Sequence, residues 1–332
     1  MRSLVVEARP RRAVLGAIGL AYALTACSPA LGRDPRSIDG QVVARLPDGR
    51  KLNFRCSGAG KPTVIFESGW GADSGAWDRV LPLVAHARRA CAYDRAGSGA
   101  SDPGPDPRDA SAIVQDLYAG LRAAHISGPY ILVGHSAGGL YVRLFAARYP
   151  REVAGLVLVD PSVEHQDARY AAVFGPGAGS VAPFHQLAAR CLDAARAGRL
   201  PSMDPALTAC APAVGAASNR ALASGWDAKL SEIDNLFTTS SDEVARESKD
   251  LGETPVVVLT AAGVDGRPNP GLSLWAELHR EIAARSRRGS ARMVDRTTHM
   301  MMFQRPDAIA DAINDVAAVS SKVSRLQDER RR

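Results

Sequence analysis

Short apolar runs of strand length alternate with helix-like segments along most of the chain. The runs are rich in β-branched residues and bounded by glycine, proline or polar residues, which predicts buried strands. We expect these strands at Thr63–Phe66, Ala90–Tyr93, Tyr130–Val133, Gly155–Val159, Pro255–Thr260 and Ala291–Val294. Apolar residues at helical spacing predict helices at Ala76–Ala87, Asp109–Ala124, Ala137–Tyr149, Leu272–Ser286 and from Pro306 to about Val319. The alternation favours an α/β fold in which helices cover both faces of a mostly parallel sheet.

Two stretches depart from this alternation. Gln41–Arg45 and Lys51–Cys56 flank the turn Pro47-Asp48-Gly49 and predict a hairpin. Residues 163–252 are rich in Ala, Pro, Gly and Ser and contain helical pieces but no strand-like run. We interpret them as an insertion over the carboxyl edge of the sheet, where such folds bind ligands. The predicted organisation is a core of residues 38–161 and 253–320, a lid of residues 162–252, and a basic tail of residues 321–332 that we expect to be disordered.

The first 26 residues have the pattern of a signal peptide, followed by a linker over residues 27–37. Four arginines precede the apolar run Ala13–Leu24, which is too short to span a membrane. Leu24-Thr25-Ala26-Cys27 resembles the lipobox of bacterial lipoproteins, which implies acylation of Cys27. The alternative is plain secretion with Cys27 as an ordinary residue, and Arg11-Arg12 leaves twin-arginine export open beside the general route. Either route predicts an exported protein in the cell envelope, touching the membrane only through its lipid anchor.

The charge of the chain lies mainly at its ends. The formal net charge is +6, of which the four arginines and one glutamate of the leader contribute +3. Much of the rest lies in the tail, so the body is nearly neutral. No basic stripe with interleaved aromatic residues is present, and the sequence gives no support for nucleic-acid binding. No C-x-x-C or H-x-x-x-H spacing indicates a metal site.

A pentapeptide of the G-x-S-x-G type lies between a predicted strand and a predicted helix. It reads Gly134-His135-Ser136-Ala137-Gly138. A tight strand-to-helix turn strains the backbone at the serine, and flanking side chains larger than hydrogen would collide with the strand and helix. The hydroxyl of Ser136 is then exposed at a helix N-terminus, where the helix dipole favours developing negative charge. We therefore take Ser136 as the candidate nucleophile.

From Ile38 to about Ser320 the chain resembles the α/β-hydrolase fold family. Besides Ser136, the stretch Tyr93–Asp102 is similar to the Y-D-x-x-G-x-G-x-S-D stretch of that family, and His299 follows the last strand where the family has its general base. The resemblance implies an eight-stranded sheet and an oxyanion hole made by backbone N–H groups. One donor is expected from Ala137 and the second from Gly69 or Trp70, where the family commonly has His-Gly.

The resemblance leaves two candidates for the acid that orients His299. Asp265 follows the seventh strand, the usual position, but its loop is atypically short. Asp160 follows the sixth strand, a position used by dehalogenase-like members. In the family the second and fourth strands are neighbours, which implies a disulfide between Cys56 and Cys91. We expect a second disulfide, Cys191 to Cys210, within the lid.

Together these features predict a serine hydrolase acting on a carboxylic ester or related small acyl compound, through an acyl-enzyme on Ser136. A serine at position 136, where dehalogenases and epoxide hydrolases of this family have an aspartate nucleophile, argues against those two activities. No cofactor is expected. Two alternatives stay open: an acyltransferase that uses the same residues, and a ligand-binding protein on a hydrolase fold. The sequence does not indicate the oligomeric state.

Overall fold

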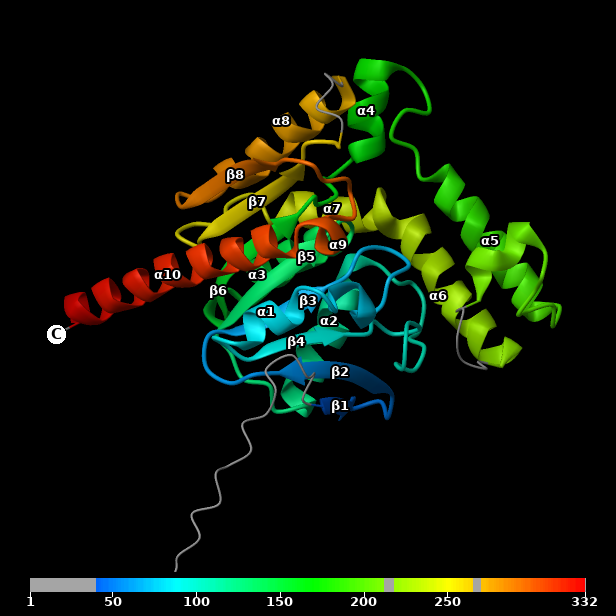
Figure 1. The fold of residues 1–332 in the computed structure, drawn as a ribbon, viewed down its shortest axis with the longest axis horizontal. Helices are drawn as coiled ribbons and strands as arrows, with labels where there is room; N and C mark the ends of the chain where they lie inside the picture. Colours follow the sequence, from blue (N-terminus) through cyan, green and yellow to red (C-terminus); the bar gives the residue numbers. More distant parts are fainter. Residues whose placement is uncertain (1–39, 212–217, 265–269, 332) are drawn as a thin grey trace, which may run out of the picture. The chain divides into compact units, whose positions relative to one another are not determined.

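The computed structural model describes residues 40–211, 218–264 and 270–331. Its centre is an eight-stranded sheet in the order β1-β2-β4-β3-β5-β6-β7-β8 (Figure 1). The first two pairings, β1–β2 and β2–β4, are antiparallel and the others are parallel. The strands are β1 (Gly40–Arg45), β2 (Lys51–Ser57), β3 (Thr63–Glu67), β4 (Ala90–Tyr93), β5 (Tyr130–His135), β6 (Val153–Val159), β7 (Val256–Ala261) and β8 (Gly289–Val294). The predicted α/β-hydrolase architecture, with eight mostly parallel strands, is confirmed.

Helices cover both faces of this sheet. One face carries α2 (Ala110–Ala123), α3 (Gly138–Arg148) and α8 (Pro270–Ala284), and the other carries α1 (Leu81–Ala85), α9 (Met301–Gln304) and α10 (Pro306–Arg331). Neighbouring strand residues point to opposite faces. Ile65 and Leu132 pack in the first cluster, whereas Phe66 and Val133 pack in the second. Because both faces are buried, the strands appear in the sequence as continuous apolar runs.

Two helices differ from their predicted extents. Ala76–Ala87 forms a 3-10 helix, Ser74–Trp77, followed by the short α1. Pro82 explains the break, because proline is accepted in the first turn of a helix but not in its interior. In contrast, α10 runs to Arg331 and so includes most of the tail that we expected to be disordered. Neither glycine nor proline follows Pro306 in the sequence, so no residue of the tail stops the helix.

The lid, residues 162–252, is helical in its described parts. It contains α4 (Gln166–Phe174), α5 (Ala182–Arg196), the 3-10 helix Pro205–Cys210, α6 (Asn219–Leu236) and α7 (Thr239–Glu247). In Figure 1, α5 and α6 lie side by side beyond the carboxyl ends of the parallel strands. Leu192, Leu207 and Trp226 belong to a hydrophobic cluster of the lid's own. The lid therefore has a small core separate from the two that enclose the sheet.

Both predicted disulfides are present. Cys56 and Cys91 are directly opposite each other on β2 and β4, with 4.1 Å between their Cα atoms. Cys191 of α5 is bonded to Cys210 in the lid. Two disulfides are typical of proteins that fold in an oxidising compartment. Within the described residues, no helix is both long enough and apolar enough to cross a bilayer.

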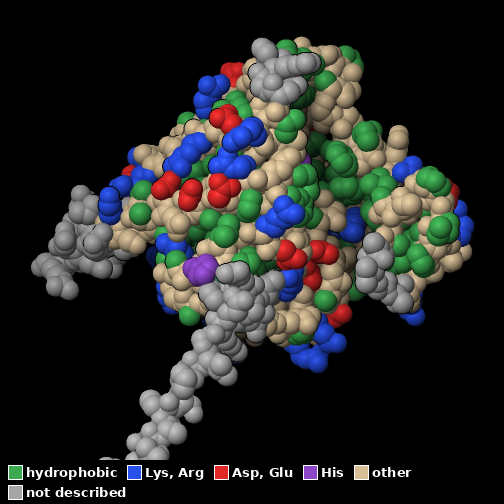
Figure 2. All heavy atoms as spheres, in the orientation of Figure 1, with side chains coloured by type: hydrophobic (Ala, Val, Ile, Leu, Met, Phe, Trp, Pro, Cys, Tyr) green, Lys and Arg blue, Asp and Glu red, His purple; other side chains and the backbone are tan. Residues whose placement is uncertain are grey.

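Acidic and basic side chains are interspersed over β8 and α10 on the face shown in Figure 2. Arg292 of β8, for example, pairs with Asp315 of α10 at 2.7 Å, and both side chains are about half exposed. Exposed pairs of this kind contribute about 0–1 kcal/mol to stability. The fold is therefore held mainly by the hydrophobic clusters on the two faces of the sheet.

Candidate active site

Ser136 lies at the turn between β5 and α3. Its φ is +51°, a left-handed conformation that is strained for a side chain other than glycine. The turn leaves no space at the flanking glycines. A Cβ on Gly134 would lie 2.5 Å from the carbonyl oxygen of Gly138, and a Cβ on Gly138 would lie 2.6 Å from the carbonyl oxygen of Glu67. The G-x-S-x-G pattern therefore marks a closely packed elbow that fixes the backbone of Ser136.

Asp160 and His299 form a hydrogen-bonded pair. Asp160 directly follows β6 and is buried, and its Oδ2 lies 2.7 Å from Nδ1 of His299. Its Oδ1 accepts hydrogen bonds from the N–H of Ala261, at 3.0 Å, and from Nε1 of Trp275, at 2.9 Å. Burial alone would raise the pKa of Asp160, but hydrogen bonding and the charge interaction with His299 outweigh it, so the pKa is lowered. The carboxylate thus stays ionised and its position is fixed by three donors.

His135, the second residue of the pentapeptide, packs against His299. The two ring centroids are 4.6 Å apart, and Nε2 of His135 lies 2.8 Å from the carbonyl oxygen of His299. Burial lowers the pKa of His135 to about 3, so its imidazole is neutral near pH 7. A carbonyl oxygen only accepts, which assigns the proton to Nε2. His135 therefore anchors the loop that carries His299.

A second buried histidine supports the Asp160 turn. Nε2 of His279 donates to the carbonyl oxygen of Pro161 at 2.9 Å, and its Nδ1 lies 2.7 Å from the hydroxyl of Thr260. Burial lowers the pKa of His279 to about 4. Sequence reasoning missed this support and that of Trp275. The available signal was their four-residue spacing, which places both on one face of α8.

One cavity brings these side chains together with the lid. Its volume is about 630 Å³, and Ser136, Asp160 and His299 all line it. Figure 2 shows hydrophobic side chains gathered beside the hollow between α4 and α6. The larger apolar side chains that line the cavity are Trp70, Tyr170, Val181, Phe184, Ile233, Leu236, Phe237, Leu272, Trp275 and Met300. Among the described residues of the lining, Asp160 is the only acidic side chain, and no lysine or arginine is present.

The candidate oxyanion donors lie close to Ser136. Gly69 and Trp70 belong to its lining, and a Cβ on Gly69 would lie 3.1 Å from Cβ of Ser136. Ala137 directly follows Ser136 and is fully buried. Within the described ranges, the backbone N–H groups of Gly69, Trp70 and Ala137 donate to no protein acceptor. All three N–H groups are therefore available to a ligand oxygen.

Two predicted positions, Asp265 and Cys27, lie outside the described residues. Among the residues that the structure describes, no three His, Cys, Asp or Glu side chains are arranged to hold a metal ion.

Comparisons with known proteins agree with this architecture. The uncharacterized protein YbdG of Bacillus subtilis is 29% identical over 142 residues, which cover 42% of this chain and 44% of that protein. The bifunctional esterase/perhydrolase DCH of Acinetobacter calcoaceticus is 35% identical over 100 residues, or 30% of this chain and 36% of that protein. The chain thus spans less than half the length of these curated relatives. A thermophilic esterase from Thermogutta terrifontis, solved with malate bound, shares the fold with a TM-score of 0.57 and 17% identity, over 85% of this chain and 99% of that one.

A profile described as the alpha/beta hydrolase family matches residues 64–312. This range contains the elbow of Ser136, the Asp160–His299 pair and the lid. The chain therefore belongs to the alpha/beta hydrolase family.

Proposed function

We propose that this protein is a serine hydrolase that cleaves a carboxylic ester or related acyl compound. The observation that carries the proposal is the Asp160–His299 hydrogen bond at 2.7 Å in the cavity that Ser136 also lines. A serine hydroxyl needs a base to remove its proton during attack, and a neutral imidazole suits that role. In this mechanism Nε2 of His299 takes the proton of Ser136 and later returns it to the leaving alcohol. A water molecule then cleaves the acyl-enzyme.

Asp160 is the acid in this proposal, and Asp265 is the alternative. A buried, ionised carboxylate on Nδ1 holds the imidazole in the tautomer whose Nε2 can accept a proton, and it stabilises the imidazolium that forms. Asp160 meets these requirements because two further donors fix its second oxygen.

The tetrahedral intermediate carries a negative oxygen that needs hydrogen-bond donors. We assign the N–H of Ala137 and that of Trp70 to this oxyanion hole, with Gly69 as the alternative to Trp70. The support is that the N–H groups of Ala137, Trp70 and Gly69 all lack protein acceptors among the described residues. Loss of one such donor costs about 3–4 kcal/mol of transition-state stabilisation in comparable sites.

The cavity lining favours an uncharged acyl group. Apart from Asp160, its described side chains are apolar or neutral, and no cation is present to bind a substrate carboxylate or phosphate. A volume of about 630 Å³ is typical of sites for small organic molecules. We infer an ester whose acyl chain packs against lid residues such as Phe184 and Leu236.

The test is hydrolysis of p-nitrophenyl esters with acyl chains of two to twelve carbons. The wild-type protein should turn over at least one of them. Ser136→Ala, which removes one hydroxyl from the cavity lining, should be folded and inactive. If the folded wild-type protein turned over none of these esters, the proposal would fail and a ligand-binding role would be favoured.

We also propose that the mature protein is exported and attached to a membrane through lipid on Cys27. The lipobox-like sequence before Cys27 and the two disulfides support this proposal. Incorporation of labelled palmitate should occur in the wild-type protein and be lost in Cys27→Ser. Equal incorporation in both would contradict lipid attachment at Cys27.

A further inference from the structure

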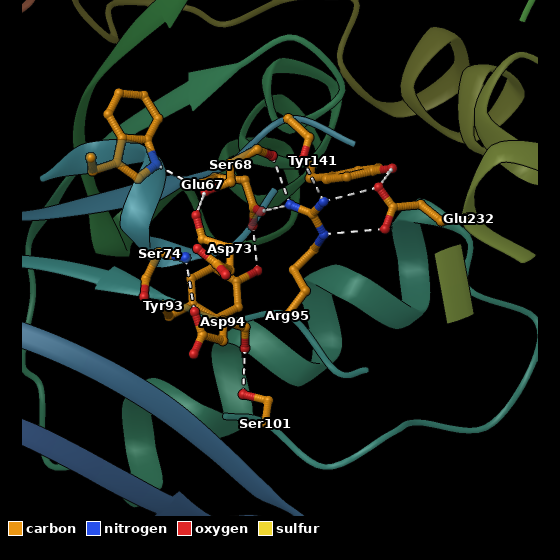
Figure 3. Close-up of polar contacts among 12 residues, drawn as sticks. Glu67, Ser68, Asp73, Ser74, Tyr93, Asp94, Arg95, Ser101, Tyr141 and Glu232 are labelled. Atoms are coloured by element: carbon orange, nitrogen blue, oxygen red, sulfur yellow. Dashed lines mark hydrogen bonds and ion pairs between the residues drawn. The ribbon is translucent and has the colours of Figure 1, made fainter. Parts of the chain in front are cut away.

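A buried arginine lies behind the loop that carries the candidate oxyanion donors. Arg95 lies two residues after the end of β4, and its side chain is 3% exposed. Figure 3 shows its guanidinium between Glu67, at the end of β3, and Glu232, on lid helix α6. The ion pairs measure 2.6 Å to Glu67 and 3.1 Å to Glu232.

All five N–H donors of this guanidinium have acceptors. One Nη1 bond goes to Glu67 and the other to the carbonyl oxygen of Ser68, at 2.7 Å. One Nη2 bond goes to the carbonyl oxygen of Gly69, at 2.8 Å, and the remaining Nη2 and Nε bonds go to Glu232. Arginine has five N–H donors in a rigid fork, so the geometry of this group is fully determined.

Two phenol groups complete the cluster. Tyr93 donates to the second oxygen of Glu67, and Tyr141 donates to Glu232 at 3.1 Å. Burial works against the charged guanidinium, but the two carboxylates outweigh it and hold the pKa of Arg95 above its ordinary value. Burying three charged groups is costly and is weak evidence for a purely stabilising role.

The two carbonyl groups that Arg95 holds belong to the peptide units of the candidate oxyanion donors. The carbonyl of Ser68 shares a peptide plane with the N–H of Gly69, and the carbonyl of Gly69 shares one with the N–H of Trp70. In a trans peptide the C=O and N–H point in opposite directions. A guanidinium that fixes both carbonyl oxygens on one side therefore fixes the direction of both N–H groups on the other side.

The lid takes part in the same arrangement. Glu232 accepts two of the five bonds of Arg95 from α6. One helical turn earlier, the carbonyl oxygen of Lys229 accepts a bond from Nε1 of Trp70 at 2.8 Å. Helix α6 thus contacts the Gly69–Trp70 segment directly through Trp70 and indirectly through Arg95.

We propose that Arg95 is a positioning residue for the oxyanion hole and that Glu232 makes lid helix α6 part of that positioning. The proposal rests on the proposed serine hydrolase function. Arg95 touches no substrate; it holds the peptide planes of Gly69 and Trp70 in the orientation that the tetrahedral intermediate requires. The lid then affects turnover as well as substrate binding.

The main test compares Arg95→Lys with Arg108→Lys. Lysine keeps the positive charge but cannot reach the same set of acceptors, because its ammonium is compact and not forked. Arg108 is a matched control: it is also 3% exposed and ion-paired, to Asp116 at 2.7 Å, and neither residue lines the cavity. We expect Arg95→Lys to lower kcat about 10²-fold, with KM within about threefold, for the p-nitrophenyl ester that the wild-type protein hydrolyses fastest. The reason is that a misdirected oxyanion donor is nearly as harmful as a missing one. Arg108→Lys should leave kcat within about twofold.

Inhibition by an aryl boronic acid separates positioning from general damage. Its tetrahedral adduct with serine places an oxygen in the oxyanion hole, so its affinity should fall with kcat in Arg95→Lys. A structural role alone would lower the thermal stability of both variants without this selective loss. Equal kcat and equal boronic acid affinity in the two variants would overturn the proposal.

A milder variant decides the matter if Arg95→Lys does not fold. Glu232→Gln keeps the shape and one acceptor of the side chain but weakens its hold on Arg95. Its control is Glu243→Gln, which changes another buried lid carboxylate, one that accepts from the N–H of Ser111 on α2. We expect kcat about tenfold lower in Glu232→Gln than in Glu243→Gln, and equal values would overturn the proposal. Absence of ester hydrolysis by the wild-type protein would instead remove the proposed function on which this inference rests.

Discussion

Two histidine–aspartate pairs in the structure differ in their surroundings. His299 pairs with Asp160 at 2.7 Å, at the carboxyl ends of the parallel strands. His185 of α5 pairs with Asp234 of α6 in the lid at 3.2 Å. The two histidine side chains are equally exposed, at 48% and 49%. The aspartates are not: Asp160 is 5% exposed and Asp234 is 50% exposed.

The difference lies in what holds each carboxylate. Asp160 follows a strand in the middle of the sheet and accepts two further hydrogen bonds from β7 and α8. Asp234 lies on the surface of a lid helix, where water screens its charge and a pair contributes about 0–1 kcal/mol. A histidine beside an aspartate is therefore not enough to suggest catalysis. A buried, fixed carboxylate that shares a cavity with a candidate nucleophile is the informative feature.

The largest expected contrast comes from removing each imidazole. His299→Ala should lower kcat about 10⁶-fold, because in comparable serine hydrolases loss of the base alone removes most of the catalytic effect of the triad. His185→Ala should leave kcat within about twofold. Steady-state hydrolysis of the best p-nitrophenyl ester measures both. If the two variants had similar kcat, His299 would not be the base.

The acids should differ by a smaller factor. Asp160→Asn should lower kcat about 10⁴-fold, because an amide can donate to Nδ1 of His299 and hold the tautomer whose Nε2 cannot take the serine proton. Asp234→Asn should have no measurable effect on kcat. Wild-type kcat in Asp160→Asn would transfer the role of the acid to Asp265.

The two buried histidines near the Asp160–His299 pair should also make the free energy of unfolding depend on pH. Folded His135 and His279 have pKa values lowered to about 3 and about 4 by burial, whereas unfolded histidines titrate near pH 6.5. Between about pH 6.5 and pH 4 the unfolded state binds two protons that the folded state does not. The free energy of unfolding should therefore fall as the pH is lowered, by about 1.4 kcal/mol per pH unit for each histidine.

Denaturant unfolding at pH 7 and pH 5 measures this slope. His279→Gln should lower the pH dependence, and His185→Gln, which alters the exposed lid histidine, should leave it unchanged. An equal slope in wild type and His279→Gln would show that the buried histidine is not the cause.

The smallest effect is expected from the lid disulfide. Cys191 and Cys210 are 19 residues apart, so replacing both by serine should lower the free energy of unfolding by about 3 kcal/mol, through the greater entropy of the unfolded chain. Neither cysteine lines the cavity, so kcat should stay within a few-fold. A loss of kcat as large as that of Asp160→Asn would mean that the hydrophobic core of the lid positions the Asp160–His299 pair. The contrast between that pair and the lid would then disappear.

Much of the core could be predicted because its signals are local. Continuous apolar runs marked the strands, and the glycines around Ser136 marked the elbow, since each feature depends on residues that are neighbours in the chain. The Cys56–Cys91 bond followed from a family strand order, and the structure confirms it.

The remaining parts depend on contacts between distant residues. Arg95 and Glu232 are 137 residues apart, and nothing in either neighbourhood indicates that they meet. The choice between Asp160 and Asp265 depends on where the His299 loop returns, which periodicity does not encode. The length of α10 was missed for another reason: charged residues suggested a disordered tail, although most of them are good helix formers.

The central claim is that His299, held by Asp160, activates Ser136. Covalent labelling with a fluorophosphonate tests this claim most directly. Such a probe reacts with a serine whose proton is removed by a base and whose adduct is stabilised by oxyanion donors. Peptide mass spectrometry of the labelled wild-type protein should find one adduct, on Ser136. The adduct should be lost in His299→Ala and retained at the wild-type rate in His185→Ala. Absence of an adduct on folded wild-type protein, or an adduct that forms equally well in His299→Ala, would contradict the account.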